Sequence, residues 1–369
     1  MSASASGQVP RRLLVVRLGA MGDVIHTMHA VARLRNALPN AQIGWMIEER
    51  WSELLCATAA ARSGARSRTR PLVDVVHLVN TKGWRKSLLS SQTRRQFSSA
   101  LKEVREQEYE LAIDFQGAIK SALLARLSRA EKVLGMDRPR ETPARMFYSA
   151  LVHTQGPHVI DHYGQLAAEV LSRSCPDQVT RAMTFPEPSL EFPHDPTSEA
   201  KVSSRLNNTT RRIVLLNPGA GWGAKQWPAE RYGEISRELQ KEGAIILVNY
   251  GPGEEQLARN VHSSSDGAAQ PITCSLGELI SLVRRASLFI GGDTGPLHLA
   301  AALGVPVVAI FGPTDPARNG PYSSKSVVIR KPASRTSLSH THAADPGLLE
   351  ITSHEVLAAA HQLLEPRHA

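Results

Sequence analysis

The sequence predicts an α/β protein of two domains, each built on a doubly wound parallel sheet. Short apolar strands alternate with helical segments along the chain, and this pattern stops and restarts once, around residues 186–208. A length of 369 residues suits two domains that each bury their own core. We expect domains at 1–185 and 186–352, and a closing helix within 353–369 that packs back on the first domain.

In the first domain, the opening strand is expected at residues 13–17. The loop 18–23 leads into a helix ending near Leu38, because apolar residues recur there at helical spacing. These residues are Val24, Met28, Val31 and Leu34. Further strands are expected at 43–47, 73–78 and 111–114, and a helix running through Arg126 follows the last of them.

Two segments interrupt this pattern. Residues 57–71 are rich in Ala, Ser and Arg with a weak pattern, which indicates an exposed and partly disordered insertion. Residues 186–208 combine several prolines with small polar and charged residues, which favours a linker between the domains.

In the second domain, strands are expected at 213–217, 244–249, 287–290 and 305–311. Helices are expected from Pro228, from Pro296 to Gly304, and over 353–364, where the pattern is amphipathic. Pro296 suits the first helical position, because a missing N–H costs nothing there.

The segment 289–316 predicts an anion-binding site. A strand enters a glycine turn and leaves as a helix with free backbone N–H groups and a positive dipole end. Thr294 offers a hydroxyl and an N–H, and Gly295 lets a phosphate approach the backbone. His298 reaches the same anion or is an ordinary surface or core histidine. We expect a nucleotide diphosphate, although the residue order is neither a P-loop nor a GxGxxG fingerprint, which argues against an ATPase.

Two loops of the second half carry groups suited to the same ligand. Lys225 ends a glycine loop that starts at Asn217, and either neutralises a departing diphosphate or is a solvated lysine. After the next strand, Glu254 either binds ribose hydroxyls or lies in a solvated turn.

A Gly-Asp pair between a strand and a helix occurs once in each half, at 22–23 and at 292–293. Ligands of doubly wound sheets bind outside the carboxyl ends of the strands, so we expect both pairs to face one interdomain cleft. Asp23 is either the N-cap of its helix or a base that accepts a proton from an attacking hydroxyl.

The net charge of +9 favours an anionic partner, or reflects an ordinary basic background. Aromatic residues make up only 5%, without interleaved basic residues, so nucleic acid is the weaker expectation. The run 82–86 and Lys120 either form a basic face for an anionic acceptor or are simply solvated.

The three cysteines are isolated, as in a reducing compartment, and the first ten residues lack the apolar core of a signal peptide. No apolar run approaches the ~18–20 residues that span a bilayer. We expect a cytoplasmic protein, at most peripheral on the inner membrane. No His or Cys pair has metal-ligand spacing, so catalysis is expected without a metal or cofactor.

Together these residues resemble glycosyltransferase family 9, the bacterial lipopolysaccharide heptosyltransferases. The matching motifs follow the family's order over nearly the whole chain. They are MGDVIHT (21–27), IDFQGAIKS (113–121), GMD (135–137), KQWP (225–228), GDTGPLH (292–298) and FGPTDP (311–316).

The resemblance implies the GT-B architecture, in which two Rossmann-like domains enclose the active site. It also implies an inverting, metal-independent transfer of L-glycero-D-manno-heptose from ADP-heptose to the Kdo of the lipopolysaccharide inner core. The first half looks like type I enzymes, whereas the Asn-Pro-Gly-Ala loop from Asn217 looks more like type II. A different acceptor, a non-catalytic nucleotide-sugar or anionic-lipid binding protein, and a nucleotide-sugar epimerase remain alternatives.

The resemblance further assigns roles to single residues. Asp23 matches the catalytic base. The donor-binding set is Asn217, Lys225, Glu254, Asp293, Thr294, Gly295 and His298. The set expected to bind a phosphorylated Kdo-lipid A acceptor is Lys82, Arg85, Lys86, Gln116 and Lys120.

Overall fold

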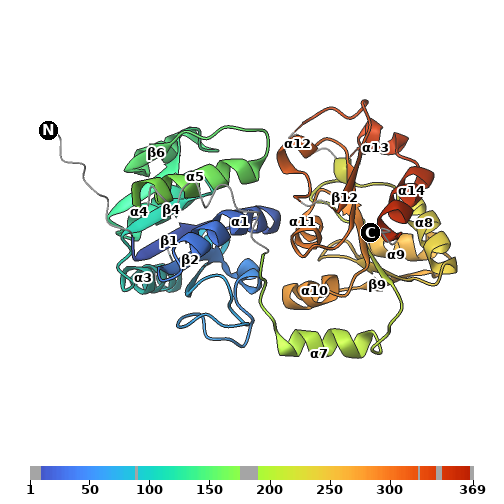
Figure 1. The fold of residues 1–369 in the computed structure, drawn as a ribbon, viewed down its shortest axis with the longest axis horizontal. Coiled ribbons are helices and arrows are strands. Elements are labelled where there is room, and N and C mark those ends of the chain that lie inside the picture. The colour runs from blue at the N-terminus through green and yellow to red at the C-terminus, as the bar shows by residue number, and fades with distance from the viewer. Residues whose placement is uncertain (1–9, 88–89, 175–189, 323–324, 338–342, 366–369) are drawn as a thin grey trace. The chain divides into compact units, whose positions relative to one another are not determined.

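The computed structural model describes residues 10–87, 90–174, 190–322, 325–337 and 343–365 (Figure 1). The chain divides into a first unit, Met1–His194, and a second unit, Asp195–Ala369. The division falls inside the segment 186–208, where the sequence predicts the linker.

The first unit contains a six-stranded sheet whose paired strands are all parallel. Across the sheet the order is β3 (Val75–Val79), β2 (Gln42–Glu48), β1 (Arg12–Val16), β4 (Leu111–Asp114), β5 (Lys132–Met136) and β6 (Ala150–Val152). The helices are α1 (Met21–Ala37), η1 (Glu49–Leu54), α2 (Thr81–Lys86), α3 (Ser91–Arg105), α4 (Ile119–Leu127), η2 (Thr142–Phe147) and α5 (Val159–Ser174).

Helices of the first unit bury both sets of alternating strand residues. Leu14 and Val16 of β1 pack in one core with residues of α2, α3 and α4. Leu13 and Val15 are also fully buried, and side chains alternate between the faces of a strand, so the second face of the sheet is covered as well. The helices α1 and α5 pack against each other. The predicted doubly wound parallel sheet is confirmed.

The second unit repeats this plan. Its parallel six-stranded sheet has the order β12 (Ser326–Arg330), β11 (Val307–Phe311), β10 (Leu288–Gly292), β7 (Ile213–Asn217), β8 (Ile245–Asn249) and β9 (Ala269–Ile272). The helices are α7 (Pro196–Arg205), η3 (Gly223–Lys225), α8 (Ala229–Lys241), α9 (Glu255–Ser264), α10 (Leu276–Val283), α11 (Gly295–Ala302), α12 (Pro316–Asn319), α13 (Pro346–Glu350) and α14 (Ser353–Leu364).

The helix α14 has the bounds that the sequence predicts. It packs on α8 and on β10, β11 and β12, and its apolar residues Val356, Ala359 and Ala360 belong to the core of the second unit. The sequence sets this helix apart from the second domain at 186–352, whereas these contacts make it part of the second unit.

Part of the predicted linker is a helix instead. Asp195 caps α7 by accepting a hydrogen bond from the backbone N–H of Thr197, and Pro196 lies in its first turn. The helix packs on α10. We interpreted the prolines of this segment as typical of a linker. The pair formed by an N-cap residue and a first-turn proline is, however, a signal for the start of a helix.

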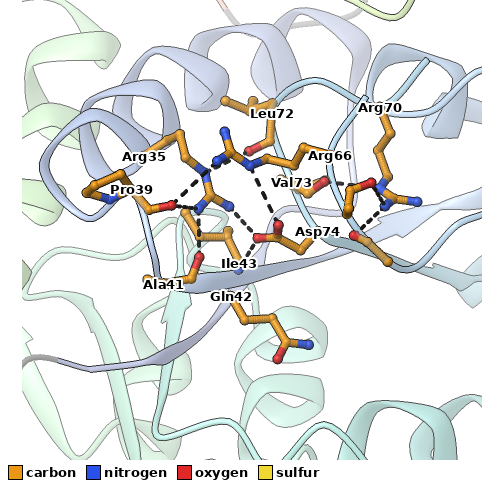
Figure 2. Close-up of polar contacts among 12 residues, drawn as sticks. Arg35, Pro39, Ala41, Gln42, Ile43, Arg66, Arg70, Leu72, Val73 and Asp74 are labelled. Carbon is orange, nitrogen blue, oxygen red and sulfur yellow. Dashed lines mark hydrogen bonds and ion pairs between the residues drawn. The ribbon is translucent and has the colours of Figure 1, made fainter. Parts of the chain in front are cut away.

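The insertion 57–71 is ordered, so the expectation of partial disorder is wrong. Arg70 is only 3% exposed and donates hydrogen bonds to the carbonyl oxygens of Ala61, Gly64, Ala65 and Val73. Figure 2 shows how Arg35 of α1 and Arg66 of the insertion both reach the Asp74 carboxylate. Buried arginines thus supply the contacts that an apolar core would otherwise provide, and a hydrophobicity pattern does not reveal them.

Candidate functional site

Asp23 lies in the first turn of α1, because the helix begins three residues earlier than the sequence suggests. The helix begins at Met21 with Ala20 as its N-cap, so Asp23 is not the cap residue itself. Its Oδ2 accepts a hydrogen bond from the Ala20 N–H at 3.2 Å and pairs with Arg17 Nη2 at 2.6 Å. The side chain is 39% exposed. Asp23 therefore combines a fixed position with access for a substrate.

Arg17 is a residue that the sequence reasoning missed. Its side chain is 5% exposed, and its Nη1 donates to the carbonyl oxygen of Phe115 at 2.7 Å. Arg17 directly follows the buried strand β1, and this charge at the end of an apolar run was the available signal. The guanidinium is held by the sheet and in turn holds the carboxylate of Asp23.

Gln116, predicted to bind the acceptor, lies beside the same loop. Its Oε1 accepts a hydrogen bond from the backbone N–H of Leu18 at 2.9 Å, and the residue is 8% exposed. This bond ties the end of β4 to the loop that leads to Asp23. In this structure Gln116 therefore positions the loop.

The turn after β4 is built around Asp114, which is fully buried. Burial raises the pKa of the Asp114 carboxyl, although hydrogen bonds from Tyr148, Gln116, Ser121 and Gly117 oppose this rise. These bonds fix the start of α4, which carries Lys120. The position of Lys120 thus depends on the buried carboxyl group of Asp114, whose role the sequence motif does not reveal.

Four of the five predicted acceptor residues are exposed cations on α2 and α4: Lys82, Arg85, Lys86 and Lys120. Lys82, Arg85 and Lys120 line one cavity of about 440 Å³. Lys86 is not among its lining residues. The structure therefore brings three of these cations together around a hollow of the first unit.

Asp293 is the centre of the predicted donor site in the second unit. Its Oδ2 pairs with Lys225 Nζ at 2.6 Å, and its Oδ1 lies 3.2 Å from His298 Nε2. Both carboxylate and ammonium side chains are 9% exposed. Burial alone would raise the pKa of the Asp293 carboxyl, but His298 and Lys225 outweigh it and hold that pKa well below its usual range.

Lys225 is neither solvated nor at the end of an open loop. It closes the short helix η3, and its Nζ lies 4.3 Å from the centre of the Trp222 ring. The Asp293 carboxylate and the Trp222 ring hold the ammonium in place. A phosphate bound here would meet a cation that is already positioned.

The start of α11 retains groups suited to an anion. Thr294 is the N-cap residue, but its hydroxyl bonds to the Gly292 carbonyl and does not cap the helix. Gly295 is the first helical residue, and Pro296 follows it, one position later than predicted. The first-turn N–H of Gly295 is therefore not used by the cap side chain.

Asn217 ends β7, and Glu254 lies on the loop after the neighbouring strand β8, at the carboxyl edge of the same sheet. Asn217 Oδ1 accepts from Asn249 Nδ2 at 2.7 Å, a buried partner that the sequence reasoning did not single out. Glu254 Oε2 accepts from the Gly251 N–H at 2.8 Å. A Cβ atom on Gly219 would lie 2.2 Å from that carboxylate, so the glycine makes room for Glu254 beside the Asn217 loop.

The residues 97–345 match glycosyltransferase family 9 (heptosyltransferase). This match covers more than half of the chain. The chain belongs to glycosyltransferase family 9. It is a glycosyltransferase, as the motifs of both units predict.

Relatives of known name agree over most of the chain. Lipopolysaccharide heptosyltransferase 1 of Pseudomonas aeruginosa is 30% identical over 86% of this chain and 82% of its own length. Lipopolysaccharide heptosyltransferase 1 of Escherichia coli K12 is 29% identical over 87% of this chain and 94% of its own length.

Among solved structures, the E. coli heptosyltransferase WaaC with ADP matches with a TM-score of 0.72 and 24% identity, covering 95% of this chain and 99% of that one. This likeness confirms the predicted GT-B architecture of two Rossmann-like domains. Among the helices of the described residues, none has the length and apolar character needed to cross a membrane.

Proposed function

We propose that this family 9 enzyme transfers L-glycero-D-manno-heptose from ADP-heptose to the Kdo of the lipopolysaccharide inner core, as a type I heptosyltransferase. The observation that carries the proposal is the accessible Asp23 carboxylate held by Arg17 at the carboxyl edge of the first sheet. The named relatives, which are lipopolysaccharide heptosyltransferases 1, support the choice of donor and acceptor.

In the proposed reaction, Asp23 is the catalytic base. An acceptor hydroxyl gives its proton to the carboxylate while its oxygen forms a bond to the anomeric carbon of the heptose. The bond between that carbon and the diphosphate oxygen breaks, and ADP leaves with the electron pair. Attack from the face opposite ADP inverts the anomeric centre. We propose that no metal ion takes part.

The donor is proposed to bind in the second unit. Lys225 and the first turn of α11 neutralise the diphosphate, whose charge rises as the bond to the sugar breaks. Glu254 binds the ribose hydroxyls, and Asp293 holds Lys225 and His298 in place.

The acceptor is proposed to be an anionic Kdo-lipid. The exposed cations Lys82, Arg85 and Lys120 support this, since they can bind its carboxylate and phosphate groups. The enzyme would then work at the cytoplasmic face of the inner membrane, in peripheral contact with it.

Mass spectrometry of the products tests the proposal. ADP-heptose is supplied with an acceptor bearing Kdo alone, or with one bearing Kdo plus one heptose. We expect a mass gain of one heptose on the first acceptor only. A gain only on the second would make this a type II enzyme. Donor turnover without acceptor would indicate an epimerase, and no turnover of any kind a binding protein.

A further inference from the structure

The cavity between α2, α3 and α4 has an apolar wall that binding of a sugar phosphate does not explain. The rings of Trp84 and Phe97 meet edge to face with centroids 5.2 Å apart. The remaining apolar lining comes from one helix, α4: Leu123, Leu124 and Leu127. The volume of about 440 Å³ lies within the range of ~300–1,000 Å³ that small-molecule sites occupy.

The rim of this cavity is strongly basic. Lys82, Arg85, Arg94 and Lys120 are exposed cations at the cavity, and none of its described lining residues carries a carboxylate. Such a combination fits an amphiphile, with an apolar chain in the hollow and an anionic group on the rim. A nucleotide base would leave its polar edge facing leucines.

The cavity extends along α4, away from the sheet edge that carries Asp23. The helices α2 and α4 start just after β3 and β4, at the sheet edge where Asp23 follows β1. Lys82 and Lys120 therefore lie near the catalytic edge. Leu127 lies seven residues further along α4, about 10 Å away at the rise of an α-helix. The hollow thus extends away from the catalytic edge.

We propose that this cavity binds one acyl chain of the phosphorylated glycolipid acceptor, with a phosphate of that lipid on the rim formed by Lys82, Arg85 and Lys120. The inference rests on the proposed function for the identity of the acceptor. The inference goes beyond that function in proposing that the enzyme binds the lipid part of its acceptor as well as the sugar.

The half-exposed residues of α4 offer a matched pair of variants. Leu123 and Ile119 are both 40% exposed, but only Leu123 lines the cavity. Leu123→Trp fills the hollow, whereas Ile119→Trp adds the same ring one turn away. Since both positions face solvent, both variants should fold.

Binding is measured by titration calorimetry with two probes, the Kdo-lipid A acceptor and its fully deacylated phosphosugar. Burial of several methylene groups predicts that the wild type binds the acylated probe at least about tenfold more tightly. Leu123→Trp should lose that advantage and keep its affinity for the deacylated probe. Ile119→Trp should behave like the wild type.

Equal affinity for both probes in the wild type would overturn the proposal. So would an equal loss in both tryptophan variants, which would indicate a general disturbance of α4. Phosphatidylglycerol vesicles are added as a competitor. If they displace the acylated probe as effectively as an excess of the acceptor does, the cavity is assigned to bilayer lipid instead. Heptose transfer to the deacylated probe is assayed in parallel, so that a failure of the proposed function shows independently of the binding data.

Discussion

The two Gly-Asp junctions share a dipeptide and differ in their environments. Gly22 and Asp23 lie in the first turn of α1, whereas Gly292 and Asp293 join β10 to α11, and each helix carries a histidine, His26 or His298. Asp23 pairs with Arg17, and its side chain is 39% exposed. Asp293 pairs with Lys225 and His298 and is 9% exposed.

This difference fits the proposed roles, in which Asp23 reacts with the substrate and Asp293 holds Lys225 and His298 in place. A carboxylate that accepts a substrate proton must be reachable and must not be buried in an ion pair that stabilises its charged form. Asp293 is buried between Lys225 and His298, and its lowered pKa makes its carboxylate a poor proton acceptor. Asp23 meets the requirement. Each of the following experiments tests the contrast, from the largest expected effect to the smallest.

The substitution Asp23→Asn should lower kcat by about 10³-fold, because the amide cannot accept the acceptor's proton. The affinity for ADP-heptose, measured by calorimetry, should change less than about twofold, and unfolding stability should stay within ~1 kcal/mol of the wild type. Turnover near the wild-type level would reduce Asp23 to a residue that only bonds the Ala20 N–H.

The substitution Asp293→Asn should act on stability instead. It leaves the buried Lys225 ammonium without its anion and His298 without its acceptor, which costs about 3 kcal/mol in similar buried ion pairs. Urea unfolding measures the loss, and the donor KM should rise with it because Lys225 is released. The companion variant Asp315→Asn removes a partly exposed helix-capping carboxylate in the same unit and should stay within ~1 kcal/mol.

Replacement of Arg17 by Met should lower kcat by roughly 10- to 100-fold at unchanged donor affinity, since the base loses the group that orients it. Arg12 is a suitable control, because it begins the strand that Arg17 follows and its ion pair with Glu108 is exposed. Arg12→Met should leave kcat unchanged. Equal effects of both substitutions would indicate a general disturbance of β1.

The smallest effect is a pH dependence of stability. The folded-state pKa of Asp293 is lowered, so its carboxylate stabilises the fold above the unfolded pKa of about 3.9 and loses this contribution as the pH falls below it. The difference in unfolding free energy between wild type and Asp293→Asn should be constant from about pH 5 to 8 and shrink below about pH 4. A difference that shrinks near pH 6 would point to His298 instead.

The sequence predicted the strands and helices well where one physical signal dominated. The strands β4 and β7 and the helix α14 have the predicted bounds, because apolar runs and periodicity mark them. The start of α1 was placed too late, since Met21 and Gly22 precede the periodic residues. The insertion 57–71 was misread because its order comes from Arg70 and the carbonyls around it.

The site was predicted as a set of residues and not as a set of contacts. The motifs named Lys225, Asp293 and His298, but no spacing rule indicated that they bond to one another. Arg17 and Asn249 were missed because each acts through a partner distant in sequence. The roles assigned to Asn217, Glu254 and the acceptor cations stay predictions.

The sequence by itself determined the architecture and the family, because strand periodicity, glycine turns and ordered motifs are local properties of the chain. Only the tertiary structure decided which of two equivalent aspartates is open and which is enclosed. It also gathered Trp84, Phe97 and Leu123 into a hollow bordered by cations. Burial and ion pairing arise between segments that folding brings together. Two aspartates that each follow a glycine therefore differ in exposure and in ion-pair partners.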